Sequence, residues 1–126
     1  MKIKAFLILI FSISLVFSCQ TEDSEEQERQ ELTEMYNEIV EMVSDTSCTD
    51  PTEWSFTAIG SKSCGGPMGF IAYPLTIDVE DFLTLVADYT EAQRQFNLKW
   101  GIVSDCMVVL PPDEIICVDG APQLVY

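Results

Sequence analysis

The sequence predicts an α+β domain in which an antiparallel sheet of four to five short strands is packed by an amphipathic helix. An N-terminal helix precedes this unit, and two disulfides staple it. Three observations lead to this prediction. Apolar residues recur at helical spacing before residue 45 and again over residues 78–97. Short β-branched and aromatic runs, separated by glycine and proline, fill the chain after Cys48. Four cysteines, Cys48 included, lie from that residue onward.

The first 18 residues have the features of a secretory signal peptide. Lys2 and Lys4 provide a positive start, and residues 5–17 are apolar apart from two serines. A membrane-spanning helix needs about 20 apolar residues, and this run is shorter than that. We therefore expect residues 1–18 to be cleaved off on export.

The residues around the cleavage site, Leu15-Val16-Phe17-Ser18-Cys19, resemble the bacterial lipobox. That motif has an aliphatic residue three positions before an invariant cysteine and a small residue directly before it. The resemblance implies a bacterial lipoprotein that is cleaved before Cys19 and held to the membrane by lipid on that thiol. The acidic stretch 20–26 resembles the export signal of Bacteroidetes-type lipoproteins, which implies a lipid anchor in the outer membrane and exposure at the cell surface.

The next segment combines an acidic tether with a helix. Residues 19–31 are polar and acidic, and we expect them to act as a tether because such a composition cannot bury a core. Helical features begin inside this stretch, since Ser24 and Gln27 have the spacing of a capping box. An amphipathic helix is predicted over residues 32–45. Its apolar face is formed by Leu32, Met35, Tyr36, Ile39, Val40 and Val43.

Residues 46–126 form the disulfide-stapled α+β domain. The predicted amphipathic helix over 78–97 has Asp78 as its N-cap and ends at Asn97 or Gly101. The other elements are strands bounded by glycine and proline. The expected strands cover residues 54–59, 70–73, 106–110, 115–118 and 124–126, with a glycine-rich loop over 60–69 and turns at 111–114 and 119–122.

Cysteine usage supports an exported, stapled domain. Cys48, Cys64, Cys106 and Cys117 are an even number in an oxidising compartment, which predicts two disulfides with three possible connectivities. We expect Cys48–Cys64 and Cys106–Cys117, because each pair is close in sequence and brackets a turn. A zinc site is disfavoured because the chain has no histidine and no Cys-x-x-Cys spacing. The sequence therefore predicts no metal and no cofactor.

The negative charge and the absence of histidine from the sequence argue against two classes of function, nucleic-acid binding and enzymatic catalysis. Residues 1–18 contain two of the six basic residues and none of the 21 acidic residues, so the chain from Cys19 onward has a formal charge of −17. Such a chain repels nucleic acid, which we exclude as a partner. Without histidine, the usual general base at neutral pH is missing. We expect a protein that is not an enzyme.

The loop from Gly60 to Gly69 is the most distinctive local sequence. Lys62, Gly65, Gly66 and Pro67 are its candidate binding residues, because Lys62 is one of few cations and the loop is restrained by Cys64 and Pro67. A structural turn, whose glycines adopt positive φ, is the simpler interpretation.

Two functions follow from these features. The leading hypothesis is a cell-envelope lipoprotein with a small binding or interaction domain for another envelope protein. The alternative is a protease-inhibitor lipoprotein that inserts Lys62 into a protease. An inhibitor requires Lys62 at a projecting tip, whereas a structural turn buries Gly65 and Gly66 against the sheet. The segment from Trp54 to Tyr126 resembles exported proteins without an assigned activity, so that resemblance adds no function.

Overall fold

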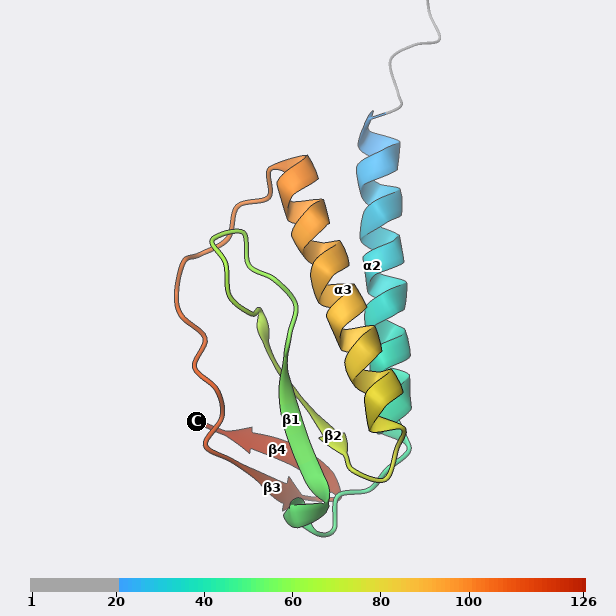
Figure 1. Cartoon of the computed structure of the whole chain (residues 1–126), viewed down its shortest axis with the longest axis vertical. Coiled ribbons are helices and arrows are strands. Elements are labelled where there is room, and N and C mark those ends of the chain that lie inside the picture. The colour runs from blue at the N-terminus through green and yellow to red at the C-terminus, as the bar shows by residue number, and fades with distance from the viewer. Residues whose placement is uncertain (1–20) are drawn as a thin grey trace, which may run out of the picture.

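Two long helices, α2 (Thr21–Ser44) and α3 (Val79–Trp100), lie side by side and run in opposite directions along the long axis of the molecule (Figure 1). The structure is a computed structural model and describes residues 21–126, with side chains from residue 24. The predicted signal peptide (residues 1–18) and Cys19 lie outside the described residues. Among the residues described, no helix is both long enough and apolar enough to cross a membrane.

Local capping signals define α3. The side chain of Asp78 accepts a hydrogen bond from the amide of Asp81 at 3.1 Å, which confirms the predicted N-cap. Gly101 ends the helix in the left-handed conformation at φ 62°, and its amide donates to the carbonyl of Asn97. The helix extends three residues past the predicted end at residue 97, because Gly101, and not Asn97, ends it.

Helix α2 begins earlier than expected. Residues 19–31 were predicted to be a tether, but α2 already includes them from Thr21 onward. Glu28 explains why this acidic end is ordered: it forms an ion pair with Lys99 and accepts a hydrogen bond from the indole of Trp100 at 2.9 Å. The beginning of α2 is therefore fastened to the end of α3.

The strands form two separate two-stranded antiparallel sheets. A short 3-10 helix, η1 (Pro51–Glu53), leads into β1 (Trp54–Ile59), which pairs with β2 (Gly69–Pro74). The second sheet pairs β3 (Glu114–Val118) with β4 (Ala121–Val125). The α+β class is confirmed, but the single sheet of four to five strands was a wrong prediction.

The strand predicted over residues 106–110 is absent. Its sequence is apolar and β-branched, yet the chain from Gly101 to Asp113 runs along the flank of the molecule without joining either sheet (Figure 1). Two local causes oppose a ladder here. A disulfide fixes Cys106 to the loop that follows β1, and the pair Pro111-Pro112 lacks amide donors at the end of the segment.

The core lies where the two helices meet β1 and β2. It consists of Ile39 from α2, Ile59 and Tyr73 from the two strands, and Phe82 and Val86 from α3. The ring centroids of Tyr73 and Phe82 are 4.8 Å apart. Ile39 and Phe82 have no exposed surface, so this cluster holds both helices against the first sheet. The groove described below lies farther along the helices, between the middle of α2 and the second half of α3.

The disulfide connectivity differs from the expectation. Cys48 is bonded to Cys117, and Cys64 to Cys106, so the predicted pairs Cys48–Cys64 and Cys106–Cys117 are wrong. The prediction assumed that residues 106–110 and 115–118 form a hairpin, which would place Cys106 near Cys117. Since that hairpin does not form, each bond instead joins segments that are far apart in the sequence.

Candidate functional site

The loop between β1 and β2 is fastened to α3 by three hydrogen bonds. The amide of Gly60 donates to the hydroxyl of Thr90 at 3.0 Å, and the amide of Ser61 donates to Oε1 of Gln93 at 2.7 Å. Asn97 closes the set by donating from Nδ2 to the carbonyl of Ser61 at 2.8 Å. All three side chains lie along one side of α3, which therefore holds the start of the loop in one position.

Gly60 is required at this junction. Its φ of +76° favours glycine, and a Cβ atom there would lie 2.6 Å from Oε1 of Gln93 and 2.9 Å from Cβ of Met68. Any side chain would displace the loop from α3.

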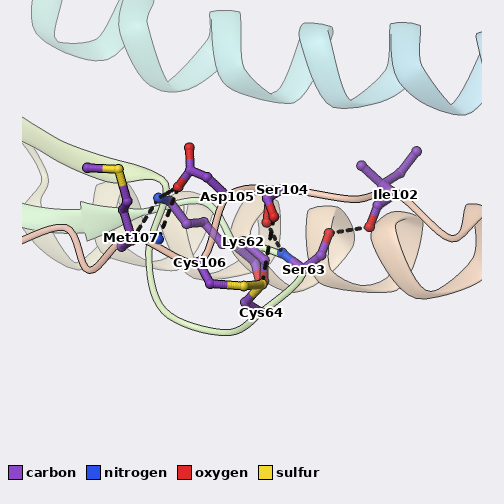
Figure 2. Close-up of a disulfide and its surroundings, with 9 residues drawn as sticks. Lys62, Ser63, Cys64, Ile102, Ser104, Asp105, Cys106 and Met107 are labelled. Atoms are coloured by element: carbon purple, nitrogen blue, oxygen red, sulfur yellow. Dashed lines mark hydrogen bonds and ion pairs between the residues drawn. A yellow bond between two sulfur atoms is a disulfide. The ribbon is translucent and has the colours of Figure 1, made fainter.

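A second set of contacts joins the loop to the segment after α3 (Figure 2). The disulfide Cys64–Cys106 connects the two chains covalently. Beside it, the amide of Ser63 donates to the hydroxyl of Ser104 at 3.0 Å, and the hydroxyl of Ser63 donates to the carbonyl of Ile102. The loop is therefore held between α3 and residues 102–107.

Lys62 points into this junction. Its Nζ lies 2.6 Å from Oδ1 of Asp105 and donates to the carbonyl of Met107 at 2.9 Å (Figure 2). Only 10% of the Lys62 side chain is exposed. The hydrogen bond from Lys62, helped by one from the amide of Met107, holds the pKa of Asp105 below its ordinary value of 3.8. This geometry is the opposite of the projecting lysine that an inhibitor requires.

The tip of the loop is formed by glycine. Gly65 and Gly66 adopt φ values of 93° and 82°, as expected for a glycine-dependent turn, but they are exposed and no atom lies within 4 Å of a Cβ built on either. The expectation that a structural turn would bury them against the sheet is wrong. Hydrogen bonds from the amide of Gly65 to the carbonyl of Lys62, and from the amide of Lys62 to the carbonyl of Gly66, close the tip at 3.0 Å and 2.9 Å.

A groove of about 380 Å³ opens between α2, α3 and this loop. Its size is within the range of ligand-binding clefts. The side chains of Gln93 and Asn97, which hold the loop, also line the groove and place amide groups next to its apolar surface. The apolar lining comes from Leu32, Tyr36, Met68, Tyr89, Phe96, Ile102 and Val103.

Two tyrosines from different helices face each other in the groove. The ring centroids of Tyr36 and Tyr89 are 5.6 Å apart with an interplanar angle of 51°. Burial, followed by the neighbouring Tyr36, raises the pKa of Tyr89 above its ordinary value of 10.0. The Tyr89 phenol therefore stays neutral at physiological pH and can donate a hydrogen bond to a ligand.

Arg29 provides the cation of the groove. Its guanidinium carbon lies 5.1 Å above the ring of Phe96, and an ion pair at 2.5 Å joins it to Glu25. Tyrosine and arginine are enriched at the energetic centres of protein interfaces. The groove thus combines aromatic, cationic and amide groups on two rigid helices.

The sequence did not predict this groove. Tyr36 was assigned to the apolar face of its helix, but that assignment does not indicate that the ring lies next to Tyr89. The role of the Gln93 and Asn97 amides could not be predicted from the sequence, because it depends on a loop more than thirty residues away in the sequence. Of the predicted binding residues, Lys62 supports the junction beside the groove, whereas Gly65, Gly66 and Pro67 line a separate hollow.

Two further findings complete the description of the site. Within the described part of the chain, no three cysteine, aspartate or glutamate side chains form a group that could hold a metal ion. Comparison with known proteins finds no protein family, no curated protein and no solved structure that matches this chain.

Proposed function

We propose that this chain is a lipid-anchored lipoprotein of the bacterial cell envelope whose domain binds a segment of another envelope protein without catalysing a reaction. The lipid anchor is supported by the lipobox-like residues up to Cys19, and the outer-membrane location by the acidic stretch after it. The non-catalytic role is supported by the absence of histidine from the sequence.

The observation that carries the binding role is the groove between α2 and α3. Its two tyrosines offer large, rigid contact surfaces that lose little conformational entropy on binding. The amides of Gln93 and Asn97 are held in place by the loop and provide fixed polar contacts. A preorganised surface of this kind suits a peptide segment with one or two apolar side chains.

The position of the groove along α2 favours a partner at the same membrane. Arg29 and Tyr36 lie eight and fifteen residues after the start of α2 at Thr21. At about 1.5 Å per helical residue, the groove lies about 12 to 22 Å along the helix from that point. Only Gln20 separates Thr21 from Cys19. A lipid on Cys19 would therefore keep the groove within a few nanometres of the membrane surface.

The inhibitor alternative receives no support from the position of Lys62. A protease pocket requires a lysine that is free to enter it, and here the side chain is nearly covered and engaged by Asp105 and Met107. The groove, by contrast, is open and exposes 42% of Tyr36. We therefore assign the binding role to the groove and not to the lysine loop.

Photo-crosslinking in living cells tests this function. A photoreactive amino acid at Met68, which is half-exposed in the groove, should give one discrete crosslinked product in the envelope fraction. The matched control position is Thr84, an exposed residue that helical spacing places on the side of α3 away from Gln93. Equal crosslinking at both positions, or none at Met68 in correctly anchored protein, would contradict the proposed function.

The anchor is tested separately. Replacing Cys19 with serine should leave an unprocessed or released protein that partitions into the aqueous phase of a detergent extraction. Unchanged processing and continued partitioning into the detergent phase would contradict the lipid anchor and leave the groove proposal to be judged on its own.

A further inference from the structure

A second surface, separate from the groove, lies on the segment that joins α3 to β3. Met107, Val108 and Leu110 expose 74%, 82% and 68% of their surface, and only Val109 between them is half-buried. Three strongly exposed apolar side chains within four consecutive residues are unusual on a monomer. Val108 and Val109 are β-branched, which favours an extended conformation.

Three consecutive residues of this segment, Val108 to Leu110, have an unpaired backbone in the described structure. No hydrogen bond within residues 21–126 uses an amide or carbonyl of Val108, Val109 or Leu110. Met107 differs, because its amide donates to Asp105 and its carbonyl accepts from Lys62. The exposed apolar side chains therefore accompany a row of free donors and acceptors, which is the composition of an unpaired sheet edge.

The two ends of the segment are fixed. At its start, the disulfide to Cys64 and the contacts of Lys62 hold residues 105–107 (Figure 2). At its end, Pro112 is buried, and the amide of Asp113 donates to the carbonyl of Val125 at 2.7 Å. A segment restrained at both ends loses less conformational entropy when it is paired. Its free backbone is thus prepared for a partner strand.

We propose that residues 107–110 are a docking edge for an extended, positively charged segment of another protein, which adds to them as a β-strand. Strand addition gains affinity from main-chain hydrogen bonds and specificity from alternate side chains. A hollow of about 200 Å³ beside Val109, lined by Gly65, Gly66 and Pro67, is placed to receive one apolar side chain of that strand. The predicted binding loop would then form one wall of this surface. The proposal is independent of the groove.

The charges near the docking edge favour a positively charged partner. All four basic residues of the described chain, Arg29, Lys62, Arg94 and Lys99, are already engaged in ion pairs. Asp113 and Glu114 follow the docking edge after two prolines, are exposed and form no ion pair within residues 21–126. A basic segment complements them, whereas a second copy of this chain would bring together two molecules that each carry a formal charge of −17 from Cys19 onward.

The probe for this surface is a blocked peptide of alternating lysine and valine, tested on the complete exported protein in detergent. Hydrogen-exchange mass spectrometry should show saturable protection of residues 107–110. A control peptide with glutamate in place of lysine should give none. Protection at other positions only, equal effects of both peptides, or no binding at millimolar peptide would overturn the proposal. Protection that rises with protein concentration without peptide would instead indicate self-pairing and would also overturn it.

Proline variants test the hydrogen bonds themselves. In a strand, neighbouring amides point to opposite edges, so only one of Val108→Pro and Val109→Pro removes a donor from the docking edge. One of the two should weaken peptide binding by about tenfold, as expected for the loss of one to two hydrogen bonds. The other variant is the internal control for folding, and Val108→Thr and Val109→Thr keep the amide. Equal binding by both proline variants would overturn the proposal.

Discussion

Replacing Cys48 and Cys117 with alanine removes the bond that fastens the β3–β4 hairpin to the segment after α2. Beyond this bond, the hairpin contacts β2 and η1, and the carbonyl of Gly120 in its turn accepts a hydrogen bond from the amide of Cys48 at 2.8 Å. A two-stranded hairpin is only marginally stable by itself. We expect this variant to lose the second sheet by local opening while α2, α3 and the first sheet remain folded.

The size of the effect follows from the length of the closed loop. The Cys48–Cys117 bond spans 69 positions and the Cys64–Cys106 bond spans 42. In the chain-entropy model, these loops correspond to about 4.4 and about 4.0 kcal/mol of stabilisation. Either loss should lower the melting temperature by on the order of 20 °C in a domain of this size. The melting temperature therefore does not distinguish the two bonds, but the position of the opening does.

Hydrogen-exchange mass spectrometry on both double-alanine variants locates the opening. Without Cys48–Cys117, the amides of residues 114–125 should exchange faster than those of the first sheet. Without Cys64–Cys106, the faster amides should be those of residues 61–66 and 102–107, because that bond holds the loop after β1. A hairpin that is equally protected in both variants would refute the reasoning, as would peptide maps that recover Cys48 joined to Cys64.

Three further predictions concern the core, the loop and its ion pair. Phe82→Ala should lower the free energy of unfolding, measured with denaturant, by about 3 to 5 kcal/mol. Leu83→Ala, at the exposed neighbour, should lower it by about 1 kcal/mol or less. Similar losses in the two variants would contradict the assignment of Phe82 to the core. Gly60→Ala should lower the free energy of unfolding by about 1 to 3 kcal/mol, because alanine is strained at a left-handed φ and its Cβ would clash with Gln93 and Met68. An unchanged free energy of unfolding would contradict the close approach of the loop to α3. An NMR titration should show the pKa of Asp105 below its ordinary 3.8 and closer to that value in Lys62→Met, where the hydrogen bond from the Met107 amide remains. Because the folded pKa is lowered, this stabilisation is present above the ordinary pKa and is lost as the pH falls through the lowered value; an unchanged titration in the variant would exclude the ion pair as its cause.

Elements with local signals were predicted well. Asp78 and Gly101 define α3 by their own capping chemistry, and the runs 54–59 and 70–73 match β1 and β2 because glycine and proline bound them. The second hairpin was placed less accurately. Asp119 and Gly120 both adopt positive φ, as in the two-residue turn that an Asp-Gly pair favours, and the predicted longer turn overlooked that preference.

Elements that depend on distant partners were predicted poorly. Residues 106–110 have a strand-like composition, but a strand needs a neighbour, and here Lys62 and Cys64 hold the segment instead. The same error reversed the disulfide pairing, since proximity in sequence was taken for proximity in space. The groove could not be predicted, because it is defined by the packing of α2 against α3 and by side chains with no individual signal.

Mass spectrometry of the N-terminal peptide, from protein purified out of the envelope of an expressing bacterium, is the most direct test of the lipid-anchored function. We predict a chain that begins at Cys19 and carries a diacylglyceryl group on that thiol. A chain that retains Met1, begins at another residue, or begins at an unmodified Cys19 would contradict the anchor and, with it, the placement of the groove next to a membrane.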